Sequence, residues 1–240
     1  MSAKASPTRT PGPLTRVALA YLAVTVIVTV VSYWAPEAYA ATAVGLVFLA
    51  ATWALVLRKD AAQIRAHGLS LGGLLEPEPF EPAHLARASA AALGWALACF
   101  VIVAPPFWLG FRAWAAPRAG FSLSAALPSM DQVMGQLVVI ALPEEAFFRG
   151  YVQTRLDEVF PKTIRIMGFP IGASIVVTSA LFAIGHVLTI PSPERLAVFF
   201  PSLLFGSLRS RTKGIGASVA LHALFNLLSG ALGRGYGVHT

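Results

Sequence analysis

The sequence predicts an all-α fold, a polytopic bundle of about seven transmembrane helices. Hydrophobic residues make up 56% of the 240 residues and charged residues only 12%, about half the charged share of a soluble globular protein. A chain with so few charges cannot cover itself with polar groups in water, so we expect lipid as its solvent. Four uncharged stretches each have the roughly 20 residues that a helix needs to cross the hydrocarbon core: residues 17–36, 38–57, 88–111 and 214–233.

Three weaker apolar segments bring the expected number of spans to about seven. Gln132–Pro143 runs directly into two acidic residues, Ile166–Pro193 is long and contains a histidine, and Leu196–Leu208 is short. Ionisable side chains inside a membrane are costly and usually functional, so the second half of the chain is expected to carry the chemistry.

The net charge of +7 indicates membrane topology rather than nucleic-acid binding. With a cytoplasmic N-terminus and seven spans, thirteen basic residues fall inside and four outside, as the positive-inside rule requires. Because the chain is also rich in Ala and Arg, we expect an integral protein of a bacterial inner membrane, with no nucleic-acid partner. The inner residues are Lys4, Arg9, Arg16, Arg58, Lys59, Arg65, Arg87, Arg155, Lys162, Arg165, Arg209, Arg211 and Lys213, and the outer ones are Arg112, Arg118, Arg195 and Arg234.

The first polar cluster is Pro143-Glu144-Glu145-Ala-Phe-Phe-Arg149. Glu145 and Arg149 are four residues apart, with the acid on the N-terminal side, which favours an ion pair on a helix. Glu144 is rotated from Glu145 by about 100°, so it must face elsewhere, as suits a carboxylate that acts on water. Pro143 removes a helical hydrogen bond and is expected to disturb the helix. Taken alone, the cluster could also be a helix end wetted by lipid headgroups.

Two further clusters place imidazoles and an amide in apolar segments. His186 lies late in an uncharged segment, and His222 and Asn226 share one face of a helix through their four-residue spacing. Each alone is more often a packing or helix-contact residue. Together with the two acids they match a hydrolytic site, with a base, an imidazole that orients water and a pair of groups that stabilises an oxyanion.

The ordered motifs Glu-Glu-x-x-x-Arg, Phe-x-x-x-His and His-x-x-x-Asn resemble those of the CPBP family of intramembrane proteases, which includes the type II CAAX prenyl endopeptidases. The resemblance covers roughly residues 130–230, and all three motifs are complete at their polar positions. It implies hydrolysis of a peptide bond within the membrane, near the C-terminus of a membrane-anchored or C-terminally hydrophobic protein substrate.

The resemblance also implies a role for each residue. Glu144 would be the general base and would share the attacking water with His186. His222 and Asn226 would stabilise the tetrahedral oxyanion. The remaining two residues, Glu145 and Arg149, would support the site through their ion pair.

No cofactor is favoured by the sequence, although the family has been described both as metalloproteases and as glutamic proteases. The chain lacks His-Glu-x-x-His, which favours the glutamic type. Zn²⁺ stays possible, because Glu144, His186 and His222 are residue types that bind it.

Two other classes of protein are open alternatives. A membrane scaffold or immunity-type protein could keep the fold without the catalysis, although it has no reason to carry the desolvation cost of the polar set. A transporter could use the His and Glu side chains as a proton relay, but we detect no inverted repeat. The substrate is also open, between a prenylated CAAX protein and a C-terminal sorting helix of the kind that the myxosortase branch is thought to remove.

The chain is thus expected to divide into four parts. Residues 1–13 form a disordered cytoplasmic tail, 14–129 contain N-terminal membrane helices with a cytoplasmic loop at 58–87, 130–233 form the catalytic helical core, and 234–240 are a short tail.

The depth of the site can be counted at about 1.5 Å per residue. Glu144 then lies roughly 20 Å from the outer end of its span, and His222 roughly 12 Å from the inner end of the last one. These counts predict a cavity that opens to the cytoplasm. His186 disagrees, because it falls roughly 24 Å from the inner end if its span begins near Pro170, and a tilted or late-starting helix would be needed to reconcile it.

Overall fold

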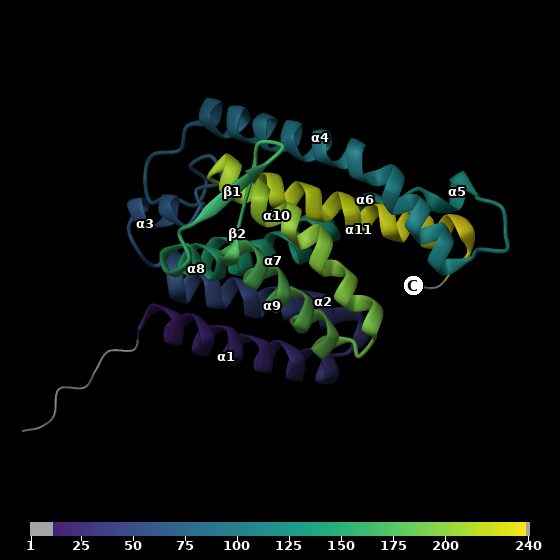
Figure 1. Ribbon diagram of the computed structural model, residues 1–240, viewed down its shortest axis with the longest axis horizontal. Helices are drawn as coiled ribbons and strands as arrows, with labels where there is room; N and C mark the ends of the chain where they lie inside the picture. Colours follow the sequence, from purple (N-terminus) through teal and green to yellow (C-terminus); the bar gives the residue numbers. More distant parts are fainter. Residues whose placement is uncertain (1–11, 239–240) are drawn as a thin grey trace, which may run out of the picture.

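The computed structural model describes residues 12–238, and within them the chain forms a bundle of long helices (Figure 1). The predicted disordered tail of residues 1–13 lies outside the described residues except for its last two positions. The last two residues of the predicted C-terminal tail are outside them as well.

Four long helices confirm the four uncharged stretches as candidate membrane spans. Each is long and apolar enough to cross a membrane. They are α1 (Pro13–Trp34), α2 (Glu37–Thr52) continued by the π-helical η1 (Trp53–Leu57), α4 (Pro82–Ala115) and α11 (Gly216–Tyr236).

Shorter helices occupy the three weaker segments. An unbroken helical stretch runs from residue 130 to 159, and two more helices follow it before α11. The stretch consists of α6 (Met130–Met134), η2 (Gly135–Ala141), α7 (Leu142–Glu145), η3 (Ala146–Gln153) and α8 (Thr154–Val159). The later helices are α9 (Ala173–Thr189) and α10 (Phe199–Thr212), and the 3₁₀ turn η4 (Pro193–Val198) lies between them. The predicted all-α bundle is therefore confirmed, with these three stretches added to the four long helices.

Three small elements connect the helices. The short helix α3 (Ala61–Ala66) lies in the predicted loop at 58–87, and α5 (Leu123–Ala126) precedes the long central stretch. The third element was not predicted: β1 (Thr163–Ile166) and β2 (Phe169–Gly172) form an antiparallel hairpin.

The hairpin corrects the predicted start of the fifth span. Its two-residue turn, Met167-Gly168, has positive φ at both positions, as a type I′ hairpin turn requires. Pro170 has no backbone N–H for a helix and Gly172 is a weak helix former, so α9 begins only at Ala173. The sequence hid this because residues 166–172, which form the end of β1, the turn and β2, are uncharged and continue directly into the apolar helix.

The central stretch is the core of the bundle. Every residue from Glu145 to Gln153 is buried, and the helices around it include α2, α9 and α10. Aromatic rings fill the contact with α2, where the ring centroid of Phe48 lies 5.5 Å from that of Phe147 and 5.7 Å from that of Phe148.

Pro143 sets the local shape of this stretch. It has no N–H to donate to the carbonyl of Val139, and the helix on either side of it widens into π-turns, as in the bond from the Leu142 N–H to the Leu137 carbonyl. The backbone of α2 approaches closely at this point. A Cβ added to Gly45 would lie 2.4 Å from the Val139 carbonyl oxygen, so only glycine fits there.

We predict that Gly45→Ala destabilises the protein by about 1–3 kcal/mol, because the added methyl group must displace backbone rather than a side chain. Thermal unfolding of the purified protein in detergent measures this. Gly110→Ala is the matched control, since a Cβ there meets no atom within 4 Å and should be neutral or slightly stabilising. Equal melting temperatures for the two variants would contradict the close approach.

Candidate active site

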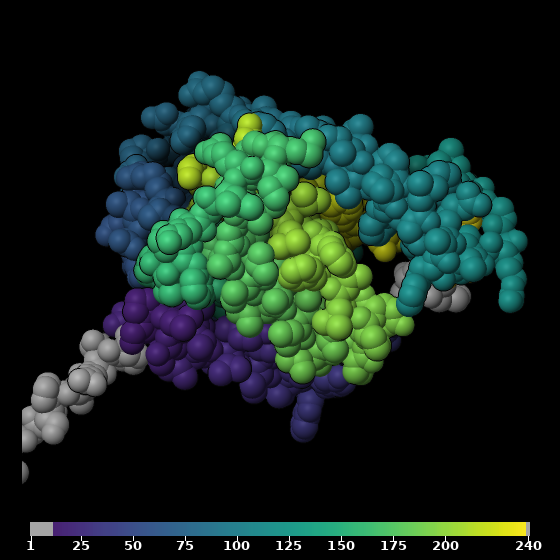
Figure 2. Space-filling model, in the orientation of Figure 1, coloured from purple at the N-terminus to yellow at the C-terminus, as the bar shows by residue number. Residues whose placement is uncertain are grey.

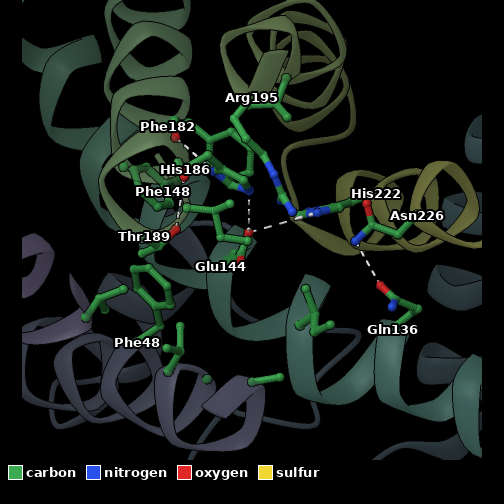
Figure 3. Close-up of a pocket in the computed structure, with 18 of the residues that line it drawn as sticks. Phe48, Gln136, Glu144, Phe148, Phe182, His186, Thr189, Arg195, His222 and Asn226 are labelled. Carbon is green, nitrogen blue, oxygen red and sulfur yellow. Dashed lines mark hydrogen bonds and ion pairs between the residues drawn. The ribbon is translucent and has the colours of Figure 1, made fainter. Parts of the chain in front are cut away.

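Four of the six predicted residues line one cavity of about 580 Å³ (Figure 3). Glu144 projects into it from α7, His186 from the end of α9, and His222 and Asn226 from α11. The other two, Glu145 and Arg149, lie behind the cavity wall with fully buried side chains.

The Glu144 carboxylate lies between the two imidazoles. Its Oε2 is 3.9 Å from Nε2 of His186 and 3.9 Å from Nε2 of His222. Both distances exceed a direct hydrogen bond and allow one water molecule to bridge the groups. Oε2 is itself buried and has no hydrogen-bond partner among the described residues.

The second nitrogen of each imidazole is fixed by an acceptor. His186 Nδ1 lies 2.9 Å from the carbonyl oxygen of Phe182, and His222 Nδ1 lies 3.1 Å from Oε1 of Glu145. A carbonyl or carboxylate oxygen can only accept, so Nδ1 carries the proton in both rings. In the neutral rings, the Nε2 lone pairs therefore face Glu144.

Glu145 joins the site to a buried cation. Its Oε2 forms the predicted ion pair with Nε of Arg149 at 3.2 Å, and both side chains have no exposed surface. The Arg149 Nη2 donates to Oγ of Ser202 at 2.9 Å. The Arg149 guanidinium also lies 4.9 Å from the Phe182 ring centroid and 5.6 Å from that of Phe205, where the ring faces favour a cation.

Asn226 has a partner that sequence reasoning missed. Its Nδ2 donates to Oε1 of Gln136 at 2.9 Å (Figure 3). His222 and Asn226 thus do share one face of α11, but each is held by a different residue of the central stretch. Gln136 is an uncharged polar residue in an apolar segment, and this feature of the sequence could have indicated that it belongs to the site.

Arg195, which the sequence placed in an outer loop, also lines the cavity. Figure 3 shows its side chain extending from η4 toward the region of Glu144 and the imidazoles. Among the described residues its guanidinium has no hydrogen bond or ion pair. The Arg195 guanidinium therefore places one positive charge in a largely apolar cavity, where it suits an anionic group of a ligand.

Comparison with protein families identifies this part of the chain. Residues 127–228 match the family described as type II CAAX prenyl endopeptidase Rce1-like. This segment is an Rce1-like region. The match contains all three polar motifs, and it supports the fold of a CAAX-type intramembrane protease for residues 127–228. Comparisons with curated proteins and with solved structures returned no match.

The cavity of the Rce1-like region extends in the direction opposite to our prediction. From Glu144 it continues between the C-terminal half of α1, the N-terminal half of α2, the beginning of η2 and the C-terminal half of α11. On the predicted topology these helix ends are all outside the cytoplasm. The predicted cytoplasmic opening and the predicted topology therefore disagree with each other, and the placement of His186, three residues before the end of α9, fits a cavity that extends toward this end of the bundle.

The reason is the packing on the other side of Glu144. Gln153 fills the space between η3 and α10, where its Nε2 donates to the Gly206 carbonyl at 3.0 Å and to Ser210 Oγ at 2.9 Å. A Cβ on Gly206 would lie 3.0 Å from Oε1 of Gln153 and 2.8 Å from the side chain of Ile175 in α9, so η3, α9 and α10 are in close contact. Counting residues along the helix predicted how deep Glu144 lies in the membrane. It could not predict on which side of Glu144 the helices pack closely and on which side the cavity lies.

The predicted zinc ligands do not fit a tetrahedral ion in this arrangement. With Zn–ligand bonds of about 2.0–2.1 Å, two donor atoms 3.9 Å apart subtend roughly 140° at the metal instead of about 109°. In residues 12–238 no three His, Cys, Asp or Glu side chains are grouped to hold a metal ion. We therefore derive no catalytic step through a metal.

We predict that Arg149→Ala lowers the free energy of unfolding by about 3–5 kcal/mol, because it leaves the buried Glu145 charge uncompensated. Denaturant or thermal unfolding in detergent measures the loss. Arg155→Ala is the control, because Arg155 pairs with Glu158 on the surface with side chains 25% and 46% exposed, and such pairs contribute about 1 kcal/mol or less. If both variants unfold alike, the Glu145–Arg149 pair does not stabilise the Rce1-like region.

Proposed function

We propose that this protein is an intramembrane endopeptidase that hydrolyses a peptide bond near the C-terminus of membrane-associated proteins. The observation that carries the proposal is the position of Glu144 Oε2, buried, unpartnered within the described chain and equally far from two imidazole Nε2 atoms. A water molecule there is within hydrogen-bond reach of a base and of two groups that orient it.

In the proposed reaction the water molecule first forms one hydrogen bond to the Glu144 carboxylate and another to the His186 Nε2 lone pair. The oxygen attacks the scissile carbonyl as Glu144 takes the proton, and a tetrahedral intermediate forms. The C–N bond then breaks as the proton passes from Glu144 to the leaving amine. The hydroxyl of the water thus ends in the new carboxyl group and its proton in the new amino group.

The intermediate carries a negative oxygen that needs donors. Asn226 has a second amide hydrogen besides the one given to Gln136. His222 presents Nε2 to the same region while its Nδ1 is held by Oε1 of Glu145, and we assign it as the second group at the oxyanion. Removing one oxyanion donor typically costs about 10²–10³-fold in rate, so both are expected to matter.

The cavity also constrains the proposed substrate. It extends toward the helix ends that carry few basic residues, is lined largely by apolar side chains, and contains the unpartnered cation of Arg195. These features favour a substrate with a hydrophobic C-terminal segment that is cut toward the outer side of the membrane, with an anionic group placed at Arg195. A C-terminal sorting helix meets this description better than a CAAX motif presented from the cytoplasm.

We predict that Glu144→Gln and His186→Ala each abolish proteolysis while the protein stays folded and inserted. Loss of a general base typically costs about 10²–10⁴-fold, and the Gln substitution removes no packing volume. The measurement is mass spectrometry of new C-termini in membranes that contain the wild type or a variant.

Glu158→Gln is the matched control, an acid-to-amide change on the exposed end of the same helical stretch, and should cleave like the wild type. Unchanged cleavage by a folded Glu144→Gln protein would contradict the assignment of Glu144 as the base, and an absence of cleavage by the wild type would favour a non-catalytic scaffold. The metal content of the active wild-type sample, and its activity after chelation, decide between a glutamic and a metal-dependent protease.

The direction of the cavity gives a separate prediction for intact cells. In a Cys99→Ala background, a cysteine at Ser229, which lines the cavity, should react with a membrane-impermeant thiol reagent from outside. A cysteine at Arg65, in the predicted cytoplasmic loop, should react only after permeabilisation. The reverse pattern would place the N-terminus outside and turn the cavity to the cytoplasm.

A further inference from the structure

The β1–β2 hairpin exposes apolar side chains instead of burying them. Ile164 is 65% exposed, Ile166 51% and Met167, at the turn, 94%. Figure 2 shows the hairpin as a raised ridge on the surface that reaches α4. An apolar ridge on a protein that crosses a membrane is stable where lipid surrounds it.

A second cavity, of about 290 Å³, lies at the base of this ridge. Three of its six lining residues are cations and none is acidic. The lining residues are Trp95, Arg165, Pro170, Ser210, Arg211 and Lys213. They come from α4, from both strands of the hairpin and from the end of α10, so the fold brings the charges together from distant parts of the sequence.

Arg211 is held in place at the centre of this cluster. Its guanidinium lies 4.3 Å from the Trp95 ring centroid and 5.4 Å from that of Phe169. Its Nη1 donates to the Gly168 carbonyl at 2.6 Å, and the Trp95 and Phe169 rings meet edge to face at 6.1 Å. These contacts leave the other guanidinium nitrogens to an external acceptor.

The cations make no direct ion pair with a carboxylate. Within residues 12–238, no ion pair joins Arg165, Arg211 or Lys213 to an acid. Of the two acids on helix α8, Asp157 accepts from the Ser174 hydroxyl and attracts Lys213 only at longer range, and Glu158 is paired with Arg155. Clustered cations without a direct ion pair, beside a tryptophan and an exposed apolar ridge, match the headgroup layer of a membrane, where the phosphate is anionic and the chains are apolar.

We propose that this cavity, formed by Arg165, Arg211, Lys213, Ser210 and Trp95, binds the headgroup phosphate of an anionic phospholipid, while the hairpin packs against its acyl chains. The guanidinium groups of Arg165 and Arg211 suit paired hydrogen bonds to phosphate oxygens, and the Lys213 ammonium adds a third charge. The site lies at the end of the bundle that the basic residues predict to be cytoplasmic, and it is separate from the Glu144 cavity.

The test uses the full-length protein purified in a neutral detergent. Phosphatidylglycerol or phosphatidylcholine with the same acyl chains is added, and native mass spectrometry counts the retained lipid while thermal unfolding measures stabilisation. We expect phosphatidylglycerol to be retained and to raise the melting temperature, with little effect of phosphatidylcholine. Each cation near an anionic headgroup contributes about fivefold in affinity, so Arg165→Gln/Lys213→Gln should weaken binding by about 25-fold.

The double variant leaves Arg211 and its contacts intact, so the hairpin keeps its anchor. Arg112→Gln/Arg118→Gln removes two exposed charges at the opposite end and should bind lipid like the wild type. Equal retention of the two lipids, or equal losses in the two double variants, would overturn the proposal. Full displacement of phosphatidylglycerol by millimolar inorganic phosphate would also overturn it, since the cavity would then be a site for a soluble anion.

Discussion

The site depends on one carboxylate that has no contact with solvent. A buried charge is tolerated only where an opposite charge and hydrogen bonds compensate it, and Glu145 meets this condition by holding Arg149 with one oxygen and His222 with the other. Arg149 in turn donates to Ser202. The central stretch, α10 and α11 are therefore locked in register, and the position of His222 opposite Glu144 follows from that register.

Two adjacent acids have opposite environments because of the helix geometry around Pro143. Neighbouring residues on a helix face directions about 100° apart, so Glu145 turns into the packed core while Glu144 reaches the cavity with 13% of its side chain exposed. One acid has both oxygens engaged by cationic or donor groups, and the other keeps an oxygen free. This division fits the roles proposed for them, in which Glu145 fixes the site and Glu144 acts on water.

The sequence predicted the spans and the local ion pair because both depend on residues close together in the chain. Uncharged length marks a membrane helix, and four-residue spacing places Glu145 beside Arg149. The contact of Gln136 with Asn226 joins residues ninety positions apart and follows from how two helices pack, which composition does not reveal. The hairpin was hidden because Ile166, Met167 and the second strand were interpreted as the start of a span, and in lipid the exposure of these apolar side chains carries no penalty.

The packing differs on the two sides of Glu144. The cavity leads to Glu144 from the side of α1's C-terminal half. Beyond it, the buried residues 145–153 close the path. Arg209, only 6% exposed, adds a second closure by donating to the Ala66 carbonyl at 3.0 Å and to Thr154 Oγ1 at 2.9 Å. Glu145 and Arg149, which hold His222 in position, therefore lie in the same packed layer that closes the cavity on this side.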